Sequence, residues 1–179
     1  MVVMSFIIVF LLSVPLSLFT QGTAEPPSRH TYPVLRLKPA AFAELPKSFV
    51  AELDRRGCTI PQPYTNRRAN VIRGRFAQPG QTDWAVLCSE NGFSSILVFW
   101  NNSERHPTEI AKWREPDSTV IYDHFIKVVG RKFIVDHYRA YGGPKPPPID
   151  HEGIESGGEK ASAVLYYYRG KWLKLQGAD

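Results

Sequence analysis

The side chains of this sequence that could serve the most kinds of reaction belong to three Asp-His dipeptides. They are separated by 13 and 14 residues: Asp123-His124, Asp136-His137 and Asp150-His151. Imidazole is both a general acid–base group and a common metal ligand, and a carboxylate can orient it. If 119–129 and 132–141 pair as a hairpin about Gly130-Arg131, His124 and His137 become cross-strand neighbours on one face. This keeps open a metal-dependent hydrolase hypothesis, in which His151 could also take part.

The favoured interpretation of these histidines is paired or solvent-exposed imidazoles. Adjacent residues of a strand point to opposite faces, so an aspartate cannot readily orient the histidine beside it. His151 also begins an HExxE string that ends at Glu155, but a zinc protease places such a string on a helix, which the surrounding prolines and glycines oppose. No nucleophile elbow, phosphate-binding loop or dinucleotide fingerprint occurs. We therefore expect no catalytic residue, no metal and no cofactor.

A basic and aromatic surface is the candidate binding region. Tyr166 and Tyr168 share one face of an expected strand, and Arg169, Lys171 and Trp172 follow at once. Such side chains can stack on glycans or bind polyanions. The favoured interpretation is that these aromatic residues are ordinary strand formers, half of them in the core.

The charge balance points to anionic partners. The 179 residues include 22 basic and 17 acidic side chains, for a net charge of +5 and a pI near 9.3. A basic protein is attracted to anionic surfaces such as cell-envelope polymers. Because the two signs are interspersed, the favoured interpretation is that the charge serves solubility alone, and we expect no nucleic-acid partner.

The N-terminal segment is typical of an export signal. Residues 2–19 are almost entirely apolar, and the first charged side chain is Glu25. Pro15 and the small residues Gly22 and Ala24 favour a signal peptide over 1–24, cleaved to leave a chain of 179 − 24 = 155 residues with no membrane span. The alternative is a retained membrane anchor, since the segment is long enough to span and begins without Lys or Arg. We expect a secreted or periplasmic protein.

The two cysteines, Cys58 and Cys88, predict a disulfide in an exported chain. The bond would close a loop of about 31 residues and stabilise the fold by roughly 3–4 kcal/mol. Cys88 lies within an apolar expected strand, where a free thiol would be buried and unreactive.

The order of elements predicts an α+β fold, with an N-terminal helix packed on a meandering antiparallel sheet. We expect an extended leader over 25–45 and a single domain over 46–179. Helical spacing predicts a helix over 46–56. The other expected elements are strands over 71–77, 83–90, 94–101, 119–130 and 131–142, an exposed loop over 142–160, and a final hairpin turning at Arg169-Gly170.

Several strings resemble a group of uncharacterised exported bacterial proteins: RGCTIPQ (56–62), QTDWAVLC (81–88), SSILVFW (94–100), GGPKPPPIDH (142–151) and VLYYYRGKW (164–172). The resemblance implies an envelope or secreted setting and brings no activity. Gly74, Phe76, Gly80, Asp83 and Trp84 locally resemble one FG-GAP repeat. Glutamine and proline stand where that repeat has calcium ligands, so only its hairpin geometry is expected here.

The leading functional hypothesis is a non-enzymatic exported accessory or binding domain, in contact with an anionic envelope polymer or another exported protein. The first alternative is the hydrolase with His124, His137 and His151. The second is an inhibitor that reaches an envelope enzyme through the proline-rich loop 143–158.

Overall fold

The computed structural model describes residues 32–65, 68–116 and 120–178. The expected signal peptide, 1–24, and the leader up to residue 31 lie outside the described residues. No helix within the described ranges is long and apolar enough to cross a membrane.

The fold is a mixed α+β structure with antiparallel sheets, but the expected meandering sheet is divided into separate sheets. Sheet 1 has the order β3 (Val71–Gly74), β4 (Asp83–Glu90), β5 (Phe93–Phe99), β6 (Thr108–Arg114). Sheet 2 has the order β10 (Lys171–Gln176), β9 (Ser162–Tyr168), β8 (Gly153–Gly157), β7 (Phe125–Val129). A small third sheet pairs β1 (Arg36–Leu37) with β2 (Ile60–Pro61).

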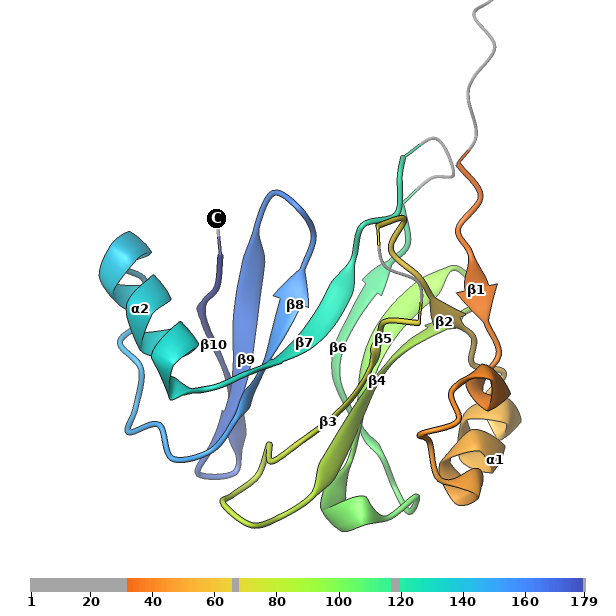
Figure 1. The fold of residues 1–179 in the computed structure, drawn as a ribbon, viewed down its shortest axis with the longest axis horizontal. Helices are drawn as coiled ribbons and strands as arrows, with labels where there is room; N and C mark the ends of the chain where they lie inside the picture. The colour runs from red at the N-terminus through yellow and green to blue at the C-terminus, as the bar shows by residue number, and fades with distance from the viewer. Residues whose placement is uncertain (1–31, 66–67, 117–119, 179) are drawn as a thin grey trace, which may run out of the picture.

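Two α-helices and two short 3-10 helices complete the described fold: η1 (Pro39–Ala41), α1 (Lys47–Arg55), η2 (Trp100–Asn102) and α2 (Arg131–Tyr141). Figure 1 shows α1 beside sheet 1, sheet 2 on the other side of sheet 1, and α2 beyond sheet 2. Apolar side chains fill the space between the sheets, among them Leu87 and Ile96 of sheet 1 and Ile126 and Ile154 of sheet 2.

The helix α1 begins after Pro46, as its sequence pattern predicts, and ends before Gly57, whose φ of 73° suits a glycine. Its fully buried residues Phe49 and Leu53 are one turn apart. The Phe49 ring stacks on Phe99 of β5 with centroids 4.6 Å apart. Part of the expected leader also enters this core, because Phe42 is almost fully buried in the same cluster.

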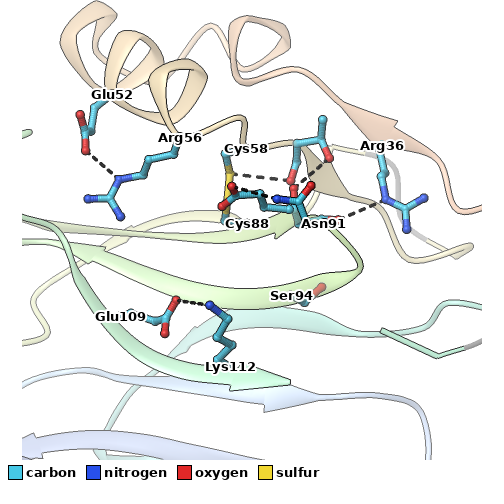
Figure 2. The surroundings of a disulfide bond; sticks show 12 residues. Arg36, Glu52, Arg56, Cys58, Cys88, Asn91, Ser94, Glu109 and Lys112 are labelled. Carbon is cyan, nitrogen blue, oxygen red and sulfur yellow. Dashed lines mark hydrogen bonds and ion pairs between the residues drawn. A yellow bond between two sulfur atoms is a disulfide. The ribbon is translucent and has the colours of Figure 1, made fainter. Parts of the chain in front are cut away.

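The predicted disulfide is present. Cys58, directly after α1, is bonded to Cys88 of β4, with Cα atoms 5.4 Å apart. Figure 2 shows the bond between the helix end and the sheet, beside the ion pair of Arg56 and Glu52 at 2.7 Å. The bond therefore joins the N-terminal elements covalently to sheet 1.

The two tight hairpins follow the sequence prediction. Asn91-Gly92 joins β4 to β5 with φ values of 50° and 76°, and Arg169-Gly170 joins β9 to β10 with 48° and 82°. Two consecutive residues with positive φ are the requirement of the two-residue hairpin turn, which asparagine and glycine meet at low cost.

The prediction of a strand over 131–142 was wrong, because 131–141 form α2. The aromatic and β-branched residues of RKFIVDHYRAY favour a strand locally, but tertiary context overrides that preference. In the helix, Ile134 is fully buried against Val164 and Leu175 of sheet 2, and Lys132 pairs with Asp136 one turn later at the surface. The expected hairpin about Gly130-Arg131 is therefore absent.

The prediction of an exposed loop over 142–160 was wrong in its second half, where β8 runs between β7 and β9. The glycines that indicated a loop are required by close packing instead. A Cβ at Gly153 would lie 2.8 Å from the Val164 side chain, and one at Gly157 would clash with the Ala161 carbonyl oxygen. Glycine here allows neighbouring chain segments to approach.

Candidate binding cleft

The three histidines lie on different elements with separate partners. His124 precedes β7, His137 is on α2, and His151 is in the segment before β8. The ring of His137 stacks on Phe133 and its Nδ1 lies 2.9 Å from the Phe133 carbonyl oxygen. The residues that the structure describes contain no group of three or more His, Cys, Asp or Glu side chains that could hold a metal ion. The hydrolase hypothesis thus loses the hairpin on which it depended.

His124 is held neutral by its surroundings. Its ring packs against Trp113 with centroids 4.4 Å apart, and its Nε2 lies 3.0 Å from the Ser156 hydroxyl. Burial disfavours the charged imidazolium. It lowers the pKa of His124 to about 4, although the Asp123 carboxylate acts in the opposite direction.

The third dipeptide fixes the segment before β8 to sheet 2. The His151 ring stacks on Tyr166, with centroids 4.3 Å apart and planes 8° from parallel. The Tyr166 hydroxyl donates to the Asp150 carboxylate at 3.1 Å. His151 Nδ1 lies 2.9 Å from the Glu152 carbonyl oxygen. These contacts hold residues 150–151 against Tyr166 of β9.

The expected basic and aromatic surface is divided between two faces of sheet 2. Tyr166 is fully buried, so it does not belong to a solvent-facing surface. Trp172 pairs with Tyr167 across the β9–β10 ladder, and both rings contact Trp100 of η2 at 5.1–5.7 Å. Strand alternation places Tyr168 and its cross-strand partner Lys171 on the opposite face. The Arg169 guanidinium lies over the Tyr168 ring at 5.2 Å.

A cavity of about 660 Å³ lies where the segment before β3 meets β7 and β8. Its volume is in the range of small-ligand sites. We call it the cleft. Its lining residues are Pro63, Thr65, Ala69, Asn70, Val71, Ile72, Asp123, Phe125, Ile126, Lys127, Glu155, Gly158, Glu159 and Ala178.

Asn70 joins the two walls of the cleft. Its side-chain amide donates to the carbonyl oxygens of Pro61 at 2.7 Å and His124 at 3.2 Å, and its Oδ1 accepts from the Ile126 N–H at 2.9 Å. The side-chain amide thus makes the hydrogen bonds that a neighbouring strand would make along the edge of β7. With φ of 73°, the residue also occupies the left-handed region that asparagine tolerates better than most side chains.

Glu155 supplies the most deeply buried charged group of the cleft. Only 5% of the residue is exposed, and its Oε1 accepts a hydrogen bond from the Ser162 hydroxyl at 2.8 Å. Lys127 stands opposite it in the β7–β8 register, but its Nζ lies over the Phe125 ring at 3.9 Å. No ion pair joins Glu155 to a cation among the described residues.

Two further carboxylates lie at the rim of the cleft. Asp123 Oδ2 accepts the Glu159 N–H at 3.0 Å, and the Asp123 carboxylate lies close against Gly158. A Cβ at Gly158 would lie 2.5 Å from the Asp123 carboxylate. Tyr64 donates its hydroxyl hydrogen to the Glu159 carboxylate, and this bond raises the pKa of Tyr64. Among the described lining residues Lys127 is the single basic one against three carboxylates, so this described lining is acidic within a basic protein.

The β3–β4 turn, where the sequence resembles an FG-GAP repeat, is held by hydrogen bonds to the Asp83 carboxylate. Asp83 is fully buried. It accepts four N–H groups: the backbone amides of Phe76, Ala77 and Asn101, at 2.8–3.1 Å, and the Gln81 side chain at 2.6 Å. Four donors satisfy a carboxylate without a cation. Asp83 therefore fastens the β3–β4 turn to η2.

No family model, curated protein or solved structure matches this chain. The cleft residues are far apart in the sequence, and the motifs found there include only two of them, Asp123 in an Asp-His dipeptide and Glu155 at the end of the HExxE string. Asn70 lies in a turn-rich stretch with no motif around it. No sequence signal joins these residues, since Asp123 falls in the expected strand 119–130 and Glu155 and Glu159 fall in the expected loop 142–160.

Proposed function

We propose that this protein is an exported, non-enzymatic binding domain whose cleft accommodates a positively charged group of its ligand, such as an amine or a guanidinium. Glu155, a carboxylate that is almost fully buried yet lines a cavity of about 660 Å³, is the observation that carries the proposal. A buried charge is costly unless it is paired. A ligand cation would supply the missing partner.

The walls of the cleft support a ligand that is partly apolar. Val71, Ile72, Phe125 and Ile126 contribute hydrophobic side chains, while Asp123, Glu155 and Glu159 contribute negative charge. Such a combination fits a lysine-like or arginine-like group, whose aliphatic stem packs on apolar surface while its head is paired. A basic segment of another exported protein has this chemistry.

The expected anionic envelope polymer needs a different surface. Arg169 lies over the Tyr168 ring and Lys171 pairs with Tyr168 across the hairpin, so positive charge and an aromatic ring meet at the β9–β10 turn. We retain this turn as a second proposed contact, and the disulfide supports an oxidising compartment for both.

The test of the cleft is a titration of the full chain with a tetralysine peptide, followed by amide chemical shifts. We expect shifts concentrated at residues 70–72, 125–127 and 155–159. Glu155→Gln keeps the shape of the side chain and removes its charge. Because hydrogen bonds to charged groups contribute about 1.5–3 kcal/mol, this variant should weaken binding roughly 10- to 100-fold.

The matched control is Glu90→Gln, at an exposed carboxylate of the β4–β5 hairpin outside the cleft lining. It should leave the affinity unchanged, and a tetraglutamate peptide should cause no shift at the cleft. Equal weakening in the two variants, or shifts spread over the whole surface, would show that the peptide senses general charge and would overturn the proposal.

A further inference from the structure

Exposed apolar side chains gather at one place on the molecule. Seven large hydrophobic residues are substantially exposed in the described part of the chain, and five of them come from three neighbouring segments. Those five are 41–56% exposed: Tyr32, Leu35, Tyr64, Val120 and Ile121. We call them the apolar patch. The other two, Phe93 and Tyr141, belong to β5 and α2.

Backbone hydrogen bonds hold the three segments of the apolar patch together. The Gln62 N–H donates to the Leu35 carbonyl oxygen at 2.8 Å, and the Tyr64 N–H donates to that of Tyr122 at 3.0 Å. A cavity of about 390 Å³ lies among them, lined by Tyr32, Pro33, Val34, Leu35, Gln62, Pro63, Tyr64, Ile121 and Tyr122. None of these lining side chains carries a formal charge, so the patch favours apolar contact over electrostatic attraction.

The position of the patch in the chain indicates what could cover it. Tyr32 is both the first described residue and part of the patch. The apolar segment 2–19 precedes it, separated by the twelve residues 20–31. Twelve residues span at most about 40 Å. A bilayer that held the apolar segment would therefore lie within reach of the patch.

The composition of the patch matches the boundary between lipid headgroups and acyl chains. Tyrosine is enriched at that boundary because one end of the ring is apolar and the other can meet water. Leucine, valine and isoleucine add apolar area for the acyl side. A second, surface-bound contact strengthens an anchored domain's hold on the membrane and sets its orientation.

We propose that the apolar patch is a membrane-contact surface, which rests on the lipid bilayer that retains the N-terminal apolar segment. The proposal assumes that residues 2–19 stay in the membrane as an anchor and are not removed as a signal peptide. The patch adjoins the cleft, since Pro63 lines both cavities and Tyr64 donates to Glu159, but the proposal does not depend on which ligand the cleft binds. Because none of the described side chains that line the cavity of the patch is charged, we expect a contact that does not require anionic lipid.

The test uses the full chain reconstituted into vesicles of pure phosphatidylcholine, with its native disulfide intact. An environment-sensitive fluorophore is attached at Ile121→Cys, and lipids with a quencher in the upper acyl chain are included. The matched control is Tyr141→Cys on α2, a residue of comparable exposure outside the patch. We expect at least threefold stronger quenching at position 121 than at position 141, unchanged in 0.5 M salt.

Each other outcome would overturn the proposal. Equal quenching at both positions would mean that the domain has no preferred orientation on the bilayer. A shielded but unquenched fluorophore at position 121 would mean that protein covers the patch, and a dimer in detergent would identify a second copy. Recovery from cells of only a released chain beginning near residue 25, shown by intact mass, would remove the tether on which the inference rests.

Discussion

Two buried carboxylates in this molecule have opposite surroundings. Asp83 in sheet 1 is fully buried and accepts four N–H groups. Glu155 in sheet 2 is 5% exposed, accepts one hydroxyl hydrogen and lines the cleft. Neither forms an ion pair within the described ranges. Burial alone therefore does not distinguish a carboxylate whose hydrogen-bonding capacity the fold fills from one that it leaves largely unfilled, whereas the number of donors does.

The largest expected effect is the loss of Asp83. Asp83→Ala leaves four N–H donors without their acceptor, and each unsatisfied buried donor costs about 1–3 kcal/mol. Partial access of water reduces the sum, so we expect a loss of about 4 kcal/mol in the free energy of unfolding. Urea denaturation measures it, with Glu90→Ala as the control. A loss below about 1 kcal/mol would contradict the structural role of Asp83.

The disulfide tests whether sheet 1 and the cleft are independent. Replacing Cys58 and Cys88 together by serine should lower the free energy of unfolding by about 3–4 kcal/mol, since the bond restricts the unfolded chain. The bond lies outside the cleft lining. Below the melting temperature, we expect the affinity for the tetralysine peptide to stay within about twofold of that of the parent chain, because neither cysteine is among the residues that line the cleft. Isothermal titration of the variant provides the measurement.

His124, beside the cleft, should make stability depend on pH. Its pKa is about 4 in the fold and 6.5 without it, so the unfolded state binds the proton first as the pH falls. The stability from the neutral imidazole is complete above pH 6.5 and is lost between pH 6.5 and 4, by about 3 kcal/mol. Unfolding at a series of pH values should show this slope, and His124→Gln should flatten it. A parallel profile for the variant would assign the slope to other groups.

The smallest expected effect completes the comparison. Glu155→Gln keeps an acceptor for the Ser162 hydroxyl and removes a buried charge, so we expect stability to change by less than about 1 kcal/mol or to rise. Thermal and urea unfolding test this in the absence of ligand. A destabilisation as large as that of Asp83→Ala would make both carboxylates structural and would remove the main support for the cleft.

Local signals accounted for the parts of the fold that the sequence predicted. The turn Asn91-Gly92 and the alternation on both sides of it define β4 and β5 within a short window, and Pro46 and Gly57 mark the limits of α1. The prediction of a strand over 131–142 was wrong because the residues of this region favour a strand locally, whereas the packing of 131–141 against sheet 2 favours a helix.

The cleft was beyond sequence reasoning for a related reason. Asn70, Asp123 and Glu155 come from three separate parts of the chain, and no local pattern brings them together. The strand that carries Glu155 was not predicted, because its glycines are typical of a loop. In the structure these positions are glycine because Val164 and the 161–162 backbone lie against them and leave no room for a side chain. Such positions identify close packing only after the neighbours are known.

Asn70 also has a consequence for the order of folding. Sheet 1 is built from the contiguous stretch 71–114 and sheet 2 from 125–176. In both sheets, strands that are neighbours in the sequence are neighbours in space, so each sheet can form without the other, and α2 lies in the connection from β7 to β8. The bonds from Asn70 to His124 and Ile126 bridge more than fifty residues and can form only when the two sheets meet. The time at which the Ile126 amide becomes protected from hydrogen exchange during refolding therefore reports when the two sheets dock. That docking is the step that creates the cleft.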